Sequence, residues 1–252
     1  MWARSHILQR MGLARRSKTD GKTGLSAHYL EKQGANIHLY LIHTARIKLV
    51  VNYLPPARVI LDLGGAGSLL YQLGYPHAFD KMTIVDLSPE QRDPQYKEMQ
   101  VSPDVPAGGE IVVRFGSMIR LEEFIDESVD LVWAGQSIEH VSRDDGKTMC
   151  QNVFRVLKKG GSFCLDTPNR YMTEIHTRPI GGGFINPDHK FEYYTDDLQA
   201  LLQENGFKIV QRLGLCHMPN SNEEFSYQDF LLGNQISIDI RNSYIQYYHC
   251  KK

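Results

Sequence analysis

The sequence lacks the features that mark metal-finger, secreted and membrane proteins. Its four cysteines include no C-x-x-C pair, so neither a zinc knuckle nor a thioredoxin-type motif is present. No apolar run approaches the length of a membrane span, and the N-terminus has no apolar core followed by small residues, as a secretory signal has. We therefore expect no membrane span and a reducing compartment, most simply the cytoplasm.

Neither sign of charge is in excess. The chain has 28 Lys and Arg against 29 Asp and Glu, a net charge of −1. This balance argues against a global electrostatic footprint for nucleic acid or an anionic membrane, although it permits a local basic patch. The basic residues Arg4, Arg10, Arg15, Arg16, Lys18 and Lys22 make the N-terminus either a solvated tail or an arm that closes over a substrate.

Apolar runs of strand length alternate with helical periodicity along most of the 252 residues. The first expected helix covers residues 35–53 and ends before Pro55 and Pro56, which cannot continue it. This alternation predicts a doubly wound α/β fold, in which helices cover both faces of a mostly parallel sheet. The expected strands are Val59–Leu63, Met82–Asp86, Ile111–Val113, Val129–Ala134, Ser162–Asp166, one that begins at Phe207–Val210, and Tyr244–Tyr248.

Capping residues mark further helices. One is expected from Ser68, directly after a glycine loop. Ser142 caps the next, with two aspartates in its first turn, and Gly160-Gly161 would end it. Thr195 caps another, whose residue just past the C-terminus would be Gly206.

The chain divides into two expected parts. Residues 1–54 would be an N-terminal arm and helices that cover the active site, and residues 55–252 would be the domain that holds the sheet. Residues at about 170–194 carry a weak pattern and contain Gly181-Gly182-Gly183. They are either a mobile lid or an ordinary long loop.

A glycine-rich turn follows the first strand. In open α/β sheets, ligands bind beyond the carboxyl ends of the strands, and small residues such as Gly64-Gly65-Ala66-Gly67 let the backbone pass close to them. Asp62 lies at the end of an apolar strand, where a buried carboxylate needs a partner such as the ammonium group of an amino-acid-like ligand. Asp86 ends the second strand and can either accept bonds from ribose hydroxyls or cap the turn at Ser88.

A nicotinamide dinucleotide is the rival ligand for this turn. Its fingerprint, G-x-G-x-x-G, could start at Gly65-Ala66-Gly67, but Leu70 then stands where the third glycine belongs. An acidic residue just before the loop also suits a cationic cofactor better than a pyrophosphate.

These motifs resemble those of the class I S-adenosylmethionine (SAM)-dependent methyltransferases. Residues 62–67 are similar to the first motif, D-x-G-x-G-x-G, although Ala66 and Ser68 replace two glycines. The resemblance covers about residues 59–251. It implies SAM as the cofactor and a seven-stranded sheet with an antiparallel last strand. It assigns the cofactor to Asp62, Gly64, Gly65, Ala66, Gly67, Asp86, Leu87, Ser117, Met118 and Gln136.

Glu139, His140 and His189 are the candidate catalytic residues. Their surroundings resemble the metal-dependent small-RNA 2′-O-methyltransferases, which carry E-x-x-E-H and D-H-K-F-E-W and whose metal holds two hydroxyls of a terminal ribose. The resemblance implies three of four ligands for Mg or Mn here, with Gln136 in place of the first glutamate, which should weaken a site for a hard cation. The Glu-His pair also resembles ubiquinone-pathway O-methyltransferases, which act on vicinal hydroxyls.

Three roles for this cluster stay open: support of the cofactor loop, a metal site, or a metal-free general base. His176 is a minor candidate in the possible lid, and Tyr193 and Tyr194 would pack the lid. Asp166 would orient the end of the fifth strand, and Asn169 would cap the loop that follows.

The function that these observations favour is SAM-dependent O-methylation of a small hydroxylated molecule, either a sugar or a vicinal diol. The alternatives are a metal-dependent RNA 3′-end 2′-O-methyltransferase, a NAD-dependent oxidoreductase and a SAM-binding module without catalysis. The near-neutral net charge makes RNA the less favoured partner. The oligomeric state has no signature in the sequence.

Overall fold

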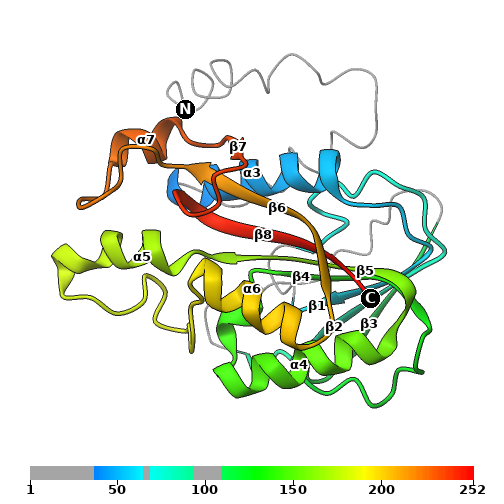
Figure 1. The fold of residues 1–252 in the computed structure, drawn as a ribbon. Helices are drawn as coiled ribbons and strands as arrows, with labels where there is room; N and C mark the ends of the chain where they lie inside the picture. Colours follow the sequence, from blue (N-terminus) through cyan, green and yellow to red (C-terminus); the bar gives the residue numbers. More distant parts are fainter. Residues whose placement is uncertain (1–36, 65–68, 93–108) are drawn as a thin grey trace.

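The structure is a computed structural model that describes residues 37–64, 69–92 and 109–252. These residues form a mixed sheet with strand order β3-β2-β1-β4-β5-β8-β6-β7 (Figure 1). The strands are β1 (Val59–Leu63), β2 (Lys81–Asp86), β3 (Glu110–Phe115), β4 (Val129–Gly135), β5 (Leu157–Pro168), β6 (Lys208–His217), β7 (Ile236–Ser237) and β8 (Ser243–Lys251).

All seven expected strands are present. Strands β3, β2, β1, β4 and β5 are parallel neighbours, whereas β8 runs antiparallel to both β5 and β6. The expected antiparallel last strand is therefore confirmed. The eighth strand, β7, pairs antiparallel with β6 and has only two residues, too few to leave a sequence pattern.

Helices cover both faces of the sheet, with α3 and α7 on one side and α4 and α6 on the other (Figure 1). Alternate residues of a strand point to opposite faces. Ile60 and Trp133 accordingly pack in the core that contains α3, while Leu61 and Val132 pack in the core that contains α4. The helices are α3 (Ile37–Tyr53), α4 (Arg143–Val156), α5 (Arg170–Thr177), α6 (Thr195–Glu204) and α7 (Tyr227–Leu232), with 3-10 turns η2 (Ile138–His140) and η3 (Arg178–Ile180).

Two expected helix boundaries are wrong. Helix α4 begins as expected, with the Ser142 hydroxyl accepting the Asp145 N–H, but it ends at Val156 rather than at Gly160. Strand β5 starts immediately because Leu157 pairs with Val129, and the register then shifts so that Ser162 pairs with Leu131.

Helix α6 is capped by Tyr194 through its backbone, so Thr195 is its first residue and not its cap. Gly206 has φ +90° directly after the cap Asn205, as expected.

The helix expected from Ser68 is also wrong for the residues that the structure describes. Residues 70–74 form a hydrogen-bonded turn, in which the Leu73 N–H donates to the Leu69 carbonyl at 3.0 Å. Gly74 then adopts φ +86° and Pro76 follows, so the turn cannot continue as a helix.

Asn169 organises the start of residues 170–194. Its Oδ1 accepts the Tyr171 N–H and so caps α5, a helix that stands where the sequence predicted a loop. Its Nδ2 lies 2.8–3.1 Å from the carbonyls of Ile240, Arg241 and Ser243. The segment is therefore anchored where it leaves β5, and its action as a lid stays a prediction. Residues 1–36 of the expected N-terminal arm lie outside the described part of the chain.

Within the described ranges, no helix combines the length and the apolar character needed to cross a membrane.

Replacing Asn169 with Ala should lower the free energy of unfolding by about 2–4 kcal/mol, because three carbonyls and one N–H lose a buried partner. Urea denaturation measures this loss. The control is Asn205→Ala, which removes one bond to the Leu201 carbonyl and should cost less than about 1 kcal/mol. Equal small losses in both variants would show that Asn169 is not the anchor.

Candidate functional site

The candidate site lies where β1 and β4 run side by side. The strand order reverses there, since β2 and β3 lie beyond β1 while β5 lies beyond β4. In open α/β sheets, ligands bind in a crevice beyond the carboxyl ends of the strands at such a reversal, and we use the word crevice for this place in the fold. Asp62 is the penultimate residue of β1 and is fully buried, and its Oδ2 accepts the Leu70 N–H at 2.7 Å. Leu70, which replaces the third glycine of a dinucleotide fingerprint, is thus a buried part of the turn.

Gly64 brings together three of the predicted cofactor segments. It has φ +67°, and its N–H donates to the Val85 carbonyl at 2.9 Å. A Cβ at this position would lie 2.8 Å from both Met118 Sδ and Ser137 Cβ, so only glycine permits the close approach. Residues 65–67 of the glycine loop lie outside the described part of the chain.

Asp86 ends β2 and is nearly buried. Its Oδ1 accepts the Leu87 N–H at 2.7 Å, which is the turn-capping contact considered from the sequence. Its Oδ2 lies 3.5 Å from Arg92 Nη2, a partner that the sequence did not reveal. Leu87 is exposed beside it, and Ser117 Oγ accepts the Ile119 N–H in the loop after β3.

Several buried polar atoms without a hydrogen-bond partner among the described residues belong to Asp62 of β1 and to the turn after β4. Burying such atoms is costly unless a ligand or water satisfies them. A carboxylate, an amide N–H₂ and a hydroxyl suit the ammonium and carboxylate of an amino-acid-bearing cofactor, so the residues present fit SAM. These atoms are Asp62 Oδ1, Gln136 Nε2, Ser137 Oγ and Glu139 Oε1.

A buried ion pair lies beneath the end of β4. Arg46 of α3 donates from Nε to Asp166 Oδ2 at 2.6 Å, and both side chains are fully buried. Burial raises the pKa of Asp166, while Arg46 opposes that shift. The Asp166 carbonyl accepts the N–H of Gln136, which adopts φ +54°. Gly135 is needed here because a Cβ would collide with Arg46 Nη2.

Arg46 was missed from the sequence. The available signal was an arginine inside the apolar repeat of the first helix.

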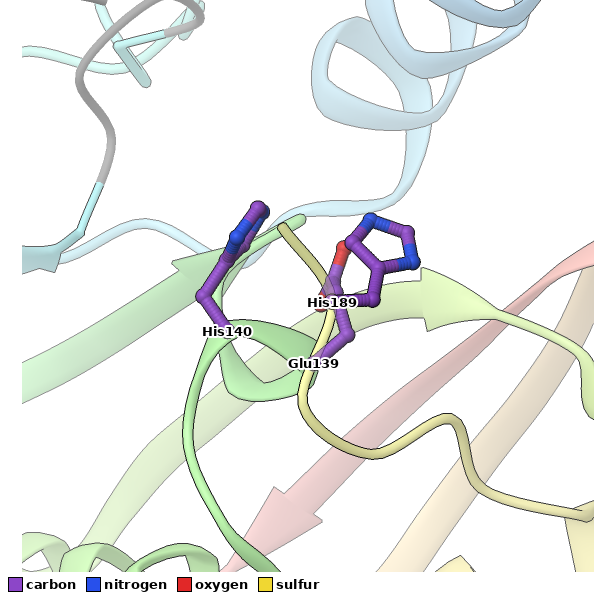
Figure 2. A group of neighbouring side chains, drawn as sticks. All are labelled: Glu139, His140 and His189. Carbon is purple, nitrogen blue, oxygen red and sulfur yellow. The ribbon is translucent and has the colours of Figure 1, made fainter. Parts of the chain in front are cut away.

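Glu139, His140 and His189 lie together, as expected (Figure 2). One potential ligand atom from each lies within 4.8 Å of the others. The first two residues belong to η2, and the third lies in the loop before α6. The N–H groups of Lys190 and Phe191 donate to the Glu139 carbonyl at 2.8 and 3.2 Å, which holds the two segments together.

Each member of this cluster has an orienting partner. His140 Nδ1 lies 2.8 Å from Asp188 Oδ2, and His189 Nδ1 lies 2.6 Å from Glu192 Oε1. Glu139 Oε2 accepts the Thr167 hydroxyl at 2.8 Å. Of these partners, Asp188 and Glu192 stand in the same short motif as His189, whereas Thr167 left no signal.

Burial and the neighbouring charges shift the pKa values of the cluster. Burial raises the pKa of Glu139, although His140 and His189 oppose the shift. Burial by itself would lower the pKa of His189, but Glu192, Glu139 and Asp188 together outweigh it, so this pKa is raised.

The remaining candidates pack away from this cluster. His176 stacks on Phe225 at 3.8 Å between ring centroids, and its Nδ1 lies 2.9 Å from the Tyr244 hydroxyl. Tyr193 is buried against Phe191, and Tyr194 donates to a glutamate of α5. Both tyrosines therefore pack, as expected.

The stability of the Asp62→Asn variant relative to the wild type should increase as the pH rises from 5 to 8. Burial raises the pKa of Asp62 to about 7; the Leu70 N–H opposes this, Asp86 adds to it and Arg46 opposes it. The folded wild type therefore holds a proton that the unfolded chain loses near pH 4, so its stability falls as the pH approaches 7. Asparagine has no such titration. Thermal unfolding at several pH values measures the difference.

The control is Asp130→Asn, since Asp130 pairs with Lys158 and its pKa is lowered. The stability that it contributes is already present at pH 5, so its loss should not change up to pH 8. A pH-independent difference for Asp62→Asn would contradict the raised pKa.

Comparison with known proteins supports the fit to SAM that the buried polar atoms indicate. Residues 61–165 match the family model of a methyltransferase domain. A probable S-adenosylmethionine-dependent methyltransferase of Mycolicibacterium smegmatis is 30% identical over 152 residues, which are 60% of this chain and 56% of that protein. The chain thus spans about half the length of the curated relative that it matches.

The chain shares its fold with solved structures, including the following two. One is a SAM-dependent methyltransferase of Thermotoga maritima, described as a possible histamine N-methyltransferase, with TM-score 0.59 and 17% identity over 88% of this chain and 94% of that chain. The other is the small RNA methyltransferase HEN1, with TM-score 0.55 and 20% identity over 88% of this chain and 25% of that chain. The matched residues 61–165 run from β1 into β5 and contain the Asp62 crevice, so this segment is similar to a methyltransferase domain, and the chain shares the fold of solved SAM-dependent methyltransferases.

Proposed function

We propose that this protein transfers a methyl group from SAM to a hydroxyl of a small molecule that carries neighbouring hydroxyls, such as a sugar or another vicinal diol. The observation that carries the proposal is the position of the Glu139, His140 and His189 cluster. Glu139 follows Ser137 by two residues, and Ser137 packs against Gly64 of the cofactor turn. An acceptor at the cluster would therefore lie beside a cofactor in the crevice.

The cofactor half of the site would act mainly by positioning. SAM supplies an electrophilic methyl group on a sulfonium. Asp62 would bind its ammonium, Asp86 its ribose hydroxyls, and the Gln136 amide and Ser137 hydroxyl its remaining polar groups. Holding an acceptor oxygen about 3 Å from the methyl carbon, in line with the breaking bond, is worth roughly 7–11 kcal/mol.

The acceptor half must bind a hydroxyl and remove its proton. Two imidazoles and a carboxylate form a donor set that fits a divalent cation, and Glu139 Oε1 has no hydrogen-bond partner among the described residues. A cation held there would bind neighbouring hydroxyl oxygens and lower the pKa of one of them. Because the donor set contains two imidazoles and one carboxylate, Mn²⁺ suits it better than Mg²⁺.

Carboxylates outside the donor set support this assignment. Metal-binding histidines usually donate their other ring N–H to a carboxylate or a carbonyl. Asp188 and Glu192 occupy that position for His140 and His189. Without a metal, His189 in its neutral form would accept the hydroxyl proton.

The same cluster favours a second candidate, a methyltransferase of the RNA 3′ end. The hydroxyls of a terminal ribose are also a vicinal diol, and the small RNA methyltransferase HEN1 shares the fold. The two candidates differ in the substrate that carries the diol, a small molecule or an RNA, so acceptor assays separate them.

S-adenosylhomocysteine should raise the melting temperature by about 5–10 °C at roughly 100 times its dissociation constant, which corresponds to about 2.7 kcal/mol. NAD should give no shift. Asp86→Ala should weaken S-adenosylhomocysteine binding, because the ribose loses an acceptor. The control is Asp80→Ala, an exposed carboxylate just before β2 that pairs with Arg58. A shift with NAD alone would overturn the proposal.

His189→Ala should lower kcat by roughly 10²–10⁴-fold while S-adenosylhomocysteine binding stays unchanged, because the residue acts on the acceptor and not on the cofactor. The assay compares a free sugar, its deoxy analogue, an RNA with a 2′,3′-diol and an amine, each with Mn²⁺ or with a chelator. His217→Ala on β6 serves as the control. Transfer only to the amine would exclude O-methylation, and full activity of His189→Ala would remove this residue from the mechanism.

A further inference from the structure

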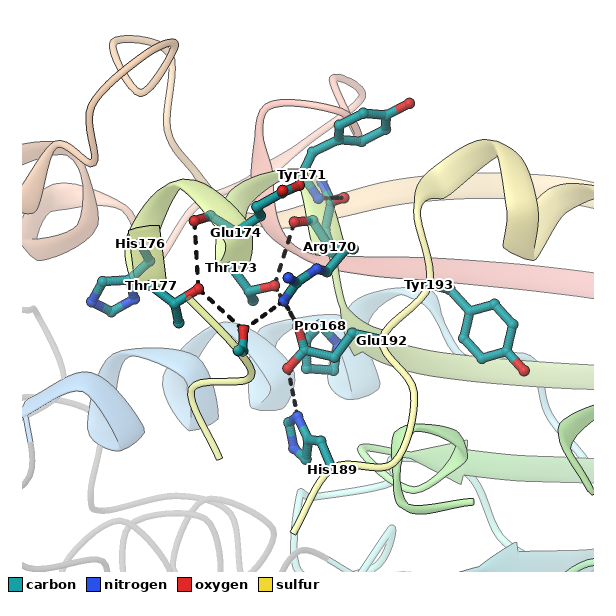
Figure 3. Close-up of polar contacts among 12 residues, drawn as sticks. Pro168, Arg170, Tyr171, Thr173, Glu174, His176, Thr177, His189, Glu192 and Tyr193 are labelled. Atoms are coloured by element: carbon teal, nitrogen blue, oxygen red, sulfur yellow. Dashed lines mark hydrogen bonds and ion pairs between the residues drawn. The ribbon is translucent and has the colours of Figure 1, made fainter. Parts of the chain in front are cut away.

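Glu192 is the centre of a buried network that joins α5 to His189 (Figure 3). Its side chain is fully buried. Oε1 lies 2.6 Å from His189 Nδ1, while Oε2 accepts the Thr173 hydroxyl and lies 3.5 Å from Arg170 Nη1. One carboxylate thus holds groups from two separate segments.

The backbone near His189 is held independently of this network. The N–H groups of Lys190 and Phe191 donate to the Glu139 carbonyl and not to Glu192. Glu192 therefore controls the ring of His189 rather than the path of its chain. An ionised carboxylate can only accept a hydrogen bond, so the proton at this contact must lie on Nδ1. Nε2 is then the ring nitrogen that can bind a ligand or accept a proton.

Helix α5 in turn determines the position of Glu192. Arg170 and Thr173 stand three residues apart, on one face of the helix. Arg170 Nη1 also donates to the Gly183 carbonyl at 2.8 Å, as does the Thr177 hydroxyl at 3.1 Å. Gly183, α5 and the His189 ring are consequently linked by one set of hydrogen bonds.

We propose that Glu192 is a positioning residue that selects the Nδ1–H tautomer of His189 and directs its Nε2 toward Glu139 and His140, and that Thr173 and Arg170 of α5 hold Glu192 in place. The consequence for function rests on the role proposed above for His189. The orientation of the ring does not, and it can be measured separately.

The first test is the protonation of the His189 ring, followed by long-range ¹H–¹⁵N correlation spectra at a pH where the ring is neutral. The wild type should show a protonated Nδ1 and an unprotonated Nε2, identified by loss of the signals in His189→Ala. In Glu192→Gln, the single amide oxygen is contested by Thr173 and Arg170, so the Nε2–H tautomer should appear. The control is Glu174→Gln, which removes a carboxylate of α5 that accepts the Tyr194 hydroxyl. An unchanged tautomer in Glu192→Gln would overturn the proposal.

The second test separates positioning from general damage to the fold. Glu192→Gln should reduce Mn²⁺ affinity or kcat by about 10–100-fold. The Mn²⁺ affinity is measured from the electron paramagnetic resonance signal of the free ion. S-adenosylhomocysteine affinity should stay within about twofold. An equal loss of S-adenosylhomocysteine affinity would mean a merely structural role and would overturn the inference.

Thr173→Val offers a milder variant, which removes one donor to Glu192 and keeps the shape of the side chain. It should change the tautomer in the same direction, and it carries the test if Glu192→Gln does not fold. If the wild type methylates none of the acceptors, the proposed function fails, while the tautomer measurement still decides the role of Glu192.

Discussion

The ion pair between Arg46 and Asp166 is the interaction on which the geometry of the site depends. A fully buried guanidinium is tolerated only when its charge and its donors are matched, and removal of one partner from such a pair typically costs about 3–5 kcal/mol. The pair fixes α3 against the end of β5. The carbonyl of the same aspartate then holds the turn at Gln136, and that turn places Ser137 against Gly64. Helix α3 lies before the segment that matches the methyltransferase family, yet it supports the crevice within that segment.

The two halves of the site are organised by opposite means. On the proposed cofactor side, Asp62, Gln136 and Ser137 keep buried polar atoms that no described group satisfies, as a ligand-binding surface requires. On the proposed acceptor side, the rings of His140 and His189 are directed by carboxylates that lie outside the cluster. A flexible acceptor can be aligned only against groups that are themselves fixed, whereas the cofactor can satisfy its own binding groups when it enters.

Local patterns in the chain anticipated much of this architecture. The strands were predictable because each is a short, largely apolar run. Glu139 and His140 were predictable because they stand together after β4, whereas His189 was added to them by the resemblance to the small-RNA 2′-O-methyltransferases. One error arose from residues within the predicted element itself, and another arose where a distant contact overrides the local signal. Residues after Ser68 lack a helix because Gly74 and Pro76 interrupt it, and α4 ends early because Leu157 pairs with β4. The cofactor loop at residues 65–67 and the N-terminal arm stay predictions.

The sequence by itself determined the order of the seven longer strands and of helices α3, α4 and α6, the carboxylates near the ends of β1 and β2, and the residue types of the candidate cluster. These properties follow from periodicity and from chemistry within a few residues. Only the tertiary structure decided that Arg46 meets Asp166, 120 positions away, and that Glu192 lies between α5 and His189. Such pairs have no sequence signature, because any buried charge needs a partner but nothing in the chain specifies which distant residue supplies it.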